Sequence, residues 1–131
     1  MSGKIESFRD LVVYQKAFEL QQAIFTTTKT FPKEELYSLT DQIRRSSRSI
    51  GANLCEAWQK RRYIAHFVSK LTDSDGEQAE TQHWIETAFA CEYIAVHKRD
   101  QLLGKCKEIG KMLGSMIASP EKFCKASGKK K

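Results

Sequence analysis

The amino-acid sequence predicts an all-α protein, an antiparallel up-down bundle of four helices, and three observations support this fold class. Apolar residues recur every three or four positions along four segments, which is typical of helices with one buried face. The chain has 131 residues but only two prolines, Pro32 and Pro120, so few positions interrupt a helix. The links between the segments are short, and short links make consecutive helices antiparallel neighbours.

The first two helices are predicted over residues 10–28 and 39–59. Pro32 lies between them and is expected to open a short helical turn. Ser38 and Asp41 have the spacing of a capping box, which predicts Ser38 as the N-cap of the second helix. The stripes at core spacing are Val13, Ala17, Leu20 and Ile24 in the first helix, and Ile43, Ser47, Ile50, Leu54 and Trp58 in the second.

The third helix is predicted to be continuous for ~35 residues, or ~50 Å. Residues 73–76 have the composition of a turn, but the helical spacing keeps its phase on both sides, so we expect a helix that bends at Gly76. The fourth helix is predicted to end before Pro120. The residues at core spacing are Phe67, Leu71, Ser74, Glu77, Thr81, Trp84, Ala88, Cys91 and Ala95 in the third helix, and Leu102, Cys106, Ile109, Leu113 and Met116 or Ile117 in the fourth.

Polar side chains fill the stripe of the second helix next to its apolar face. Ser and Asn are poor helix formers, and inside a helix they are favoured mainly when their side chains are hydrogen-bonded. We therefore predict a network with polar residues in core register on the third helix, in which Glu77 pairs with Arg45 or Asn53. A pocket or subunit contact that uses the same groups is the alternative. The predicted network comprises Arg45, Ser49, Asn53, Glu56, Ser74, Glu77 and Thr81.

The net charge of +6 has two sources. Five of the 22 Lys and Arg residues, and no acid, lie in residues 122–131, so the other 17 basic residues against 16 acids leave +1. We predict a bundle domain over residues 1–120 and a basic disordered tail over 121–131. Within the bundle, basic residues concentrate in residues 41–62. The candidate nucleic-acid-binding residues are Arg44, Arg48, Lys60, Arg61 and Arg62.

A solvated basic face is the alternative interpretation of this region, because clusters of Lys and Arg are common. The aromatic residues Trp58 and Tyr63 lie close to the cluster in sequence and favour a contact with nucleic acid.

The motifs of enzymes and metal sites are missing from the sequence. Glu80 and His83 have the Glu-x-x-His spacing of di-metal bundles, but such a site needs a second copy, which the sequence does not contain. No Gly-rich phosphate loop or nucleophile motif occurs. We predict a non-enzymatic protein without metal or cofactor; a site assembled between subunits is the alternative. The four cysteines are expected to be small reduced thiols, rather than disulfide or zinc ligands: Cys55, Cys91, Cys106 and Cys124.

The hydropathy of the chain predicts a cytoplasmic protein with no membrane contact. No apolar run approaches the ~18–20 residues of a membrane span, and the N-terminus lacks a charged-then-apolar signal sequence.

Four motifs occur in order along residues 8–116. They are Phe8-Arg-Asp-Leu-x-Val-Tyr-Gln-Lys-Ala17; Phe31-Pro32 followed by Leu39-Thr-x-Gln-Ile-Arg-Arg45; Ser49-Ile-x-Ala-Asn-Leu-x-Glu56; and Ser74-x-x-Glu77 with Glu80-Thr-Gln82. Together they resemble the family of four-helix bundle proteins encoded in intervening sequences of 23S ribosomal RNA genes. Two departures are Gly51, where many members have Pro, and Ala57 with Trp58, which replace the usual Gly.

The resemblance implies a ring-shaped homopentamer, with the first two helices at the seam. The family is similar to the accessory variability protein of diversity-generating retroelements, a basic pentameric barrel that binds a reverse transcriptase and nucleic acid. The partners implied are therefore further copies of the chain, RNA or DNA, and a reverse transcriptase. We expect a homo-oligomeric nucleic-acid-binding accessory protein; the alternative is a structural or protein-partner adaptor.

Overall fold

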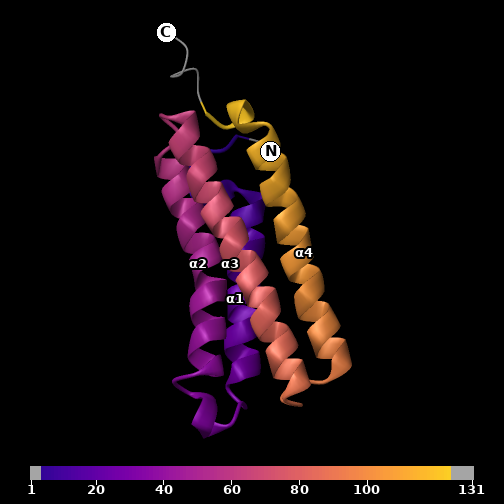
Figure 1. Ribbon diagram of the computed structural model, residues 1–131. Coiled ribbons are helices and arrows are strands. Elements are labelled where there is room, and N and C mark those ends of the chain that lie inside the picture. The colour runs from indigo at the N-terminus through magenta and orange to yellow at the C-terminus, as the bar shows by residue number, and fades with distance from the viewer. Residues whose placement is uncertain (1–3, 125–131) are drawn as a thin grey trace.

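The computed structural model describes residues 4–124 of the chain. Within this range the chain forms four α-helices and no strand, and the helices lie side by side as a bundle (Figure 1). The all-α fold class is therefore confirmed. The α-helices are α1 (Val12–Thr28), α2 (Leu39–Gln59), α3 (Ile64–Ala90) and α4 (Val96–Ala118). The short 3-10 helices are η1 (Phe8–Asp10), η2 (Lys33–Glu35) and η3 (Pro120–Lys122).

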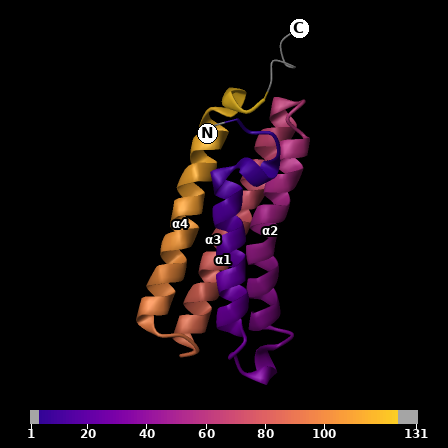
Figure 2. The ribbon, with the colours of Figure 1, turned by 180° about the vertical axis from the view of Figure 1, so that it is seen from behind.

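Successive helices run in opposite directions, which gives the up-down topology. In Figure 1, α1 and α3 descend whereas α2 and α4 ascend, and in the view from behind α1 lies between α2 and α4 (Figure 2). None of the helices in residues 4–124 combines the length and the apolar character needed to span a lipid bilayer.

The core is one apolar cluster that all four helices share. Most of its large side chains are fully buried, and each helix contributes them at the predicted spacing of three and four. A smaller cluster of Phe31, Leu39 and Ala88 closes the end of the bundle near η2. The largest fully buried side chains are Leu20 and Ile24 of α1, Ile43, Ile50 and Leu54 of α2, Phe67, Leu71 and Ile85 of α3, and Leu102, Ile109 and Leu113 of α4.

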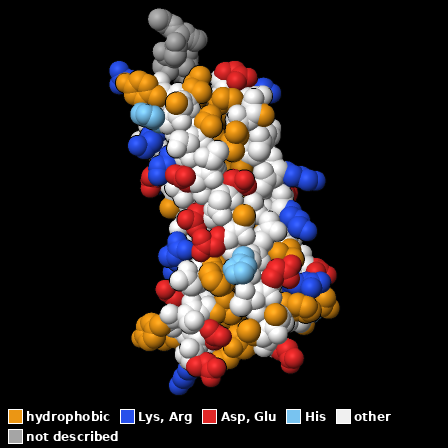
Figure 3. Space-filling model, viewed as in Figure 1, with side chains coloured by type: hydrophobic (Ala, Val, Ile, Leu, Met, Phe, Trp, Pro, Cys, Tyr) orange, Lys and Arg blue, Asp and Glu red, His pale blue; other side chains and the backbone are white. Residues whose placement is uncertain are grey.

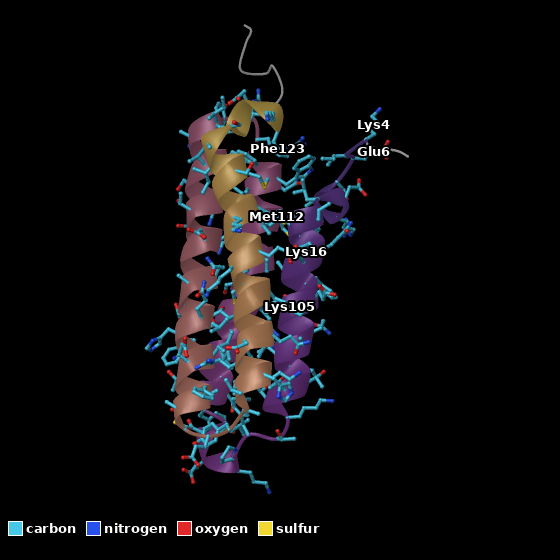
Figure 4. All side chains as sticks on the ribbon, turned by 90° about the vertical axis from the view of Figure 1, so that its right-hand side faces the viewer. Lys4, Glu6, Lys16, Lys105, Met112 and Phe123 are labelled. Carbon is cyan, nitrogen blue, oxygen red and sulfur yellow. The ribbon has the colours of Figure 1, made fainter. Side chains whose placement is uncertain are left out.

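Two ion pairs join α1 to α4 at the edge of the core. Lys16 pairs with Glu108 at 3.2 Å. Lys105 pairs with Glu19 at 3.4 Å, so each helix supplies one cation and one acid (Figure 4). All four side chains are a quarter or more exposed, and pairs of this kind contribute about 0–1 kcal/mol each.

Helix α2 has the predicted bounds, but the predicted capping box at its start is wrong. The Ser38 side chain makes no capping hydrogen bond. Instead, the η2 turn brings Glu35 to the helix start, where its Oε1 accepts the Leu39 N–H at 3.1 Å. Its other carboxylate oxygen accepts the Tyr93 hydroxyl at 2.8 Å, which raises the pKa of Tyr93 to about 12. Glu35 thus ties η2, α2 and the α3–α4 link together.

Helix α3 is continuous through Gly76, as the unbroken periodicity predicted. Four positions assigned to its core stripe are wrong, however: Cys91 and Ala95 are exposed and lie beyond the end of the helix, and two others are shifted by one residue. Gln78 and Ile85 are buried, whereas Glu77 and Trp84 flank the stripe and are partly exposed. The reason is geometric: alternation of four and three from Phe67 leads to positions 78 and 85, one residue beyond those chosen from the sequence.

Helix α3 ends at Ala90, five residues before the predicted Ala95. The Tyr93 N–H donates to the Ala88 carbonyl and the Glu92 N–H to the Phe89 carbonyl, both at 2.9 Å. These two bonds form a Schellman motif, in which Glu92 takes the left-handed position with φ of 65°. Glycine usually occupies that position, so the sequence carried no signal for this helix end.

Residues 121–124, which the composition assigned to the tail, pack against the bundle. The Phe123 ring lies 6.2 Å from the Phe67 ring, and Cys124 is only 8% exposed. The other residues of the predicted tail, 125–131, lie outside the described range. All the cysteines are free thiols; Cys106 is also buried, which raises its pKa to about 12, whereas Cys91 is exposed.

We predict that Glu92→Gly stabilises the protein by about 1 kcal/mol, because glycine adopts the left-handed conformation without a Cβ clash. Urea denaturation measures the change. The matched control is Glu86→Gly at an exposed position inside α3, which should lose about 1 kcal/mol. An equal loss in both variants would contradict the Schellman assignment.

Candidate nucleic-acid interface

A buried polar chain joins α2 to α3. Thr81 Oγ1 donates to the Glu77 carbonyl at 2.8 Å and lies 2.9 Å from Ser46 Oγ. Either hydroxyl can be the donor in the second bond, because Ser46 Oγ also lies 3.4 Å from the Ile43 carbonyl oxygen, its alternative acceptor. Ser74 Oγ donates to the Ile50 carbonyl at 2.9 Å. Ser46, Ser74 and Thr81 are fully buried, so these bonds satisfy groups that would otherwise be costly to bury.

Lys70 is the centre of a second group of contacts, nearer the end of α2. Its ammonium pairs with Glu56 at 2.9 Å and Asp73 at 3.7 Å, and it donates to the Asn53 side chain at 3.4 Å. The Lys70 ammonium lowers the pKa of the Glu56 carboxyl. Ser49 stays within its own helix, because its hydroxyl donates to the Arg45 carbonyl. Sequence reasoning missed both Lys70 and Ser46.

Arg45 is the arginine of α2 that α3 neutralises. Its guanidinium contacts Glu80 Oε2 at 2.7 Å and Glu77 Oε1 at 3.8 Å. Arg45, and not Asn53, is therefore the partner of Glu77. Glu77 Oε1 is buried and has no hydrogen-bond partner among residues 4–124. Burial, followed by the nearby Glu80 charge, raises the pKa of Glu77.

Glu80 and His83 do not converge on a common point. The Glu80 carboxylate is occupied by Arg45 and by the Trp84 indole N–H at 3.0 Å. His83 is exposed and packs edge-on against Trp84. In the part of the chain that the structure describes, no group of three or more His, Cys, Asp and Glu side chains could hold a metal ion.

The predicted basic region divides into two parts at opposite ends of α2. Arg44 and Arg48 lie in its first half, near η2, whereas Lys60, Arg61 and Arg62 follow its last residue. At 1.5 Å per residue, Arg44 and Lys60 are about 24 Å apart along the helix axis. The five residues therefore cannot contact one phosphate together.

Three cations surround the ring of Phe25, and we call this group the Phe25 cluster. The Lys29 ammonium lies 5.0 Å from the ring centroid, and the guanidinium carbons of Arg44 and Arg48 lie at 4.8 and 5.7 Å. These distances are in the range of cation–π contacts. Among residues 4–124, no carboxylate forms an ion pair with any of the three.

An open groove of about 550 Å³ runs beside this cluster along the outer face of α2. Arg44 and Arg48 line it, and the Tyr37 side chain at its end is 91% exposed. The face shown in Figure 3 differs from the surroundings of the Phe25 cluster, because acidic and basic side chains lie interspersed there over α3 and its neighbours. Asp41 and Arg45, which is paired with Glu80, also line the groove. The groove therefore combines one acid, two arginines without an ion pair among residues 4–124 and an aromatic ring available for stacking.

The second basic part is held more tightly. The Arg61 guanidinium lies 3.5 Å from the Trp58 ring centroid, and its Nε donates to the Trp58 carbonyl at 2.8 Å. Burial against these groups lowers the pKa of Arg61. Arg62 lies 5.9 Å from the Tyr63 ring, and Lys60 is exposed at the C-cap of α2. Arg61 therefore presents less of its guanidinium to a ligand than the sequence implied.

Residues 9–115 match the family model of the 23S rRNA-intervening sequence protein. The chain belongs to this family. A solved structure from Bacteroides thetaiotaomicron, described as a protein of unknown function from the S23 ribosomal protein family, is 33% identical. The similarity covers 82% of this chain and 96% of that one, with a TM-score of 0.75. The comparison with curated proteins finds no match.

The family membership agrees with the bundle described above but assigns no activity to it. The Phe25 cluster was not found from the sequence, although its components were visible there. Phe25 of α1 and Lys29 at its C-cap are four residues apart, and Arg44 and Arg48 are four apart on α2, so each pair shares a helix face. The missing information was that these two faces meet.

We predict that Glu77→Gln raises the free energy of unfolding at pH 7 by about 0.5–1 kcal/mol, because it removes a buried charge without a hydrogen-bond partner. Arg45 is not left uncompensated, since it is 48% exposed and keeps Glu80. The matched control is Glu80→Gln, which should be less stable by about 1–2 kcal/mol because it weakens the bonds to Arg45 and Trp84.

The pH dependence gives an independent check. The folded protein holds the Glu77 proton more tightly than the unfolded chain, whose ordinary pKa is 4.5. The stability contributed by this group is therefore present below pH 4.5 and is lost as the pH rises through the higher folded pKa. Denaturation midpoints of wild type and Glu77→Gln should diverge over that interval; parallel pH profiles would show that Glu77 is solvated.

Proposed function

We propose that the protein is a non-enzymatic, homo-oligomeric scaffold of the cytoplasm that binds RNA or DNA through phosphate contacts. The observation that carries the proposal is the Phe25 cluster, with three cations that no acid of residues 4–124 neutralises. Arg44 and Arg48 are the main contacts. Lys60, Arg61 and Arg62 form a second contact region just beyond the end of the same helix.

The convergence of three cations on one ring distinguishes the cluster among residues 4–124, because each of the other cation–π contacts involves a single cation. Lys16 and Lys105 pair instead with acids between α1 and α4, and Arg45 and Lys70 with acids between α2 and α3. Three like charges around one ring repel each other, and an anion from outside the bundle lowers that repulsion. A polyanion with regularly spaced phosphates suits an open groove better than a compact acidic ligand does.

Tyr37 supports single-stranded nucleic acid as the ligand. A tyrosine ring that is 91% exposed beside two arginines can stack on an unpaired base while the cations hold the backbone. Stacking of this kind tolerates every base, and phosphate contacts carry no base code. The binding is therefore expected to depend little on sequence and strongly on salt.

The α1–α2 face supports self-association into a ring, most readily a pentamer as the family resemblance implies. The Phe8 ring of η1 and the Tyr14 and Phe18 rings of α1 pack in series, with centroids 5.0 and 6.3 Å apart. Phe18 remains 47% exposed. Burying its side chain between copies would be favourable. A ring would also repeat the basic groove, so that weak contacts act multivalently.

A reverse transcriptase is proposed as a protein partner on the family resemblance alone. If the protein associates with itself but not with nucleic acid, the adaptor function replaces the present proposal.

Sedimentation should detect an oligomer at micromolar concentration, most simply at five times the 15.0 kDa of one chain. Phe18→Glu should shift the protein toward the monomer, because it places a charge in the proposed seam. The control is Val96→Glu, an equally exposed apolar residue at the start of α4. A monomeric wild type would overturn the ring.

Salt titration of the affinity for single-stranded RNA tests nucleic-acid binding. We compare the full chain, residues 1–124, and residues 1–124 with Arg44 and Arg48 changed to Gln. Removing these two arginines should weaken binding and lower the slope of log affinity against log salt by about 0.7 for each phosphate that the variant no longer neutralises. The matched control changes Lys107 and Lys111, exposed on α4, to Gln.

If removal of residues 125–131 alone abolishes binding, the tail explains the affinity and the groove has no role. If the arginine variant binds like the control, the α2 groove is not the site. Changing Arg61 and Arg62 to Gln in a parallel variant shows how much the second region contributes.

A further inference from the structure

A small hollow lies where α1 ends, η2 turns and α2 begins. Its volume is about 150 Å³. Three of its lining residues are cations, Lys29, Lys33 and Arg44, and no lining residue is an acid. Two more, Thr28 and Thr40, carry hydroxyl groups. The hollow is thus smaller than the α2 groove and has a higher share of basic residues.

Arg44 is fixed in place at this hollow. Thr28 Oγ1 donates its proton to the Phe25 carbonyl at 3.0 Å and accepts the Arg44 Nε–H at 2.8 Å. The guanidinium carbon of Arg44 is also held 4.8 Å from the Phe25 centroid. The terminal nitrogens of Arg44 have no hydrogen-bond partner among residues 4–124, so the donor pair that suits a phosphate oxygen remains available.

Thr40 adds a polar group to the lining of the hollow. The residue is only 3% exposed, and its hydroxyl has no hydrogen-bond partner in the described part of the chain. Its oxygen does not belong to the fully buried atoms without a partner, so it is open to the hollow. An oxygen atom of a bound anion can therefore accept its proton in place of water.

The charges around the hollow favour an anion. Glu35, which belongs to the adjoining η2 turn, is occupied by the Leu39 N–H and the Tyr93 hydroxyl. The start of α2 and the end of α1 carry opposite partial charges of about half a unit, which largely cancel. Glu34 of η2 and Asp41 of α2 are nearby in sequence but do not line the hollow. The three positive charges of the lining therefore decide the sign of the potential inside it.

We propose that this hollow binds the terminal phosphate monoester of a nucleic-acid strand, with Lys29, Lys33 and Arg44 as the cations and Thr40 as a hydrogen-bond donor. A phosphodiester inside a strand continues on both sides and fits the open groove, whereas a terminal phosphate can enter a hollow from one side. A monoester also carries about −1.5 to −2 at pH 7, against about −1 for a diester, which matches three cations better.

The inference rests on the proposed function, because it names the part of the strand that this end of α2 holds. Arg44 belongs to both the groove and the hollow, so the strand would pass from the hollow along α2 toward Arg48. Lys33 lines only the hollow, so a substitution there tests binding in the hollow without altering the lining of the groove.

The experiment compares RNA oligonucleotides of one sequence that carry a 5′-phosphate, a 3′-phosphate or hydroxyls at both ends, with the full-length protein. One of the phosphorylated strands should bind about tenfold more tightly than the hydroxyl strand. The preference should decrease below about pH 6, because the monoester then binds a proton and gives up its second charge. Lys33→Gln should reduce the preference without changing binding of the hydroxyl strand, because Lys33 lines only the hollow. Thr40→Val should also reduce the preference, and because Thr40 lines the groove as well, this variant is judged by the ratio of its affinities for the two strands.

Lys111→Gln is the matched control and should keep the full preference, because this exposed lysine lies on α4. Inorganic phosphate, followed by shifts of the Thr40 and Lys29 amide resonances, tests whether the hollow accepts the free ion. Equal binding of all three strands by wild type would overturn the inference, and salt-dependent binding of those strands would leave the proposed function standing. If inorganic phosphate shifts the amide resonances but no strand binds, the hollow is a site for free phosphate. That result would overturn both the inference and the proposed function.

Discussion

The unequal neutralisation of three arginines on α2 is the interaction on which the proposed function depends. Arg44, Arg45 and Arg48 lie within two turns of one helix, but only Arg45 faces the carboxylates of α3 and contacts Glu80 at 2.7 Å. The other two turn toward α1, where they meet the Phe25 ring and, within residues 4–124, pair with no acid. All three arginines line the α2 groove, but the carboxylates of α3 neutralise Arg45 and leave the charges of Arg44 and Arg48 for a ligand.

The sequence predicted the fold well where periodicity alone decides the structure. The continuity of α3 followed from a spacing that keeps its phase across Gly76, which has the composition of a turn. The errors occur where distant segments meet or where an unusual residue takes a backbone role. Ser38 is the N-cap of α2 as predicted, but the Glu35 side chain and not that of Ser38 accepts the N–H at the helix start, because η2 folds back onto it. Glu92 occupies the left-handed position that ends α3, where glycine is the usual residue.

The candidate site was predicted only in part, because a basic run in sequence is not a basic patch in space. The region around Arg48 and the region around Arg61 were joined on the sequence, but they lie toward opposite ends of a helix of 21 residues. The aromatic partner Phe25 and the third cation, Lys29, come from the segment of α1. Their juxtaposition depends on how α1 is rotated against α2, which no local pattern specifies.

The most direct measurement compares Arg45→Gln with Arg48→Gln, two substitutions three residues apart that remove the same charge. Stability by urea denaturation and the salt slope of RNA affinity are measured for both. We predict that Arg45→Gln loses about 0.5–1 kcal/mol of stability and keeps the wild-type slope. Arg48→Gln should keep the stability and lower the slope. If both variants lower the slope equally, or if Arg48→Gln destabilises the fold as Arg45→Gln does, the division of roles on α2 is wrong.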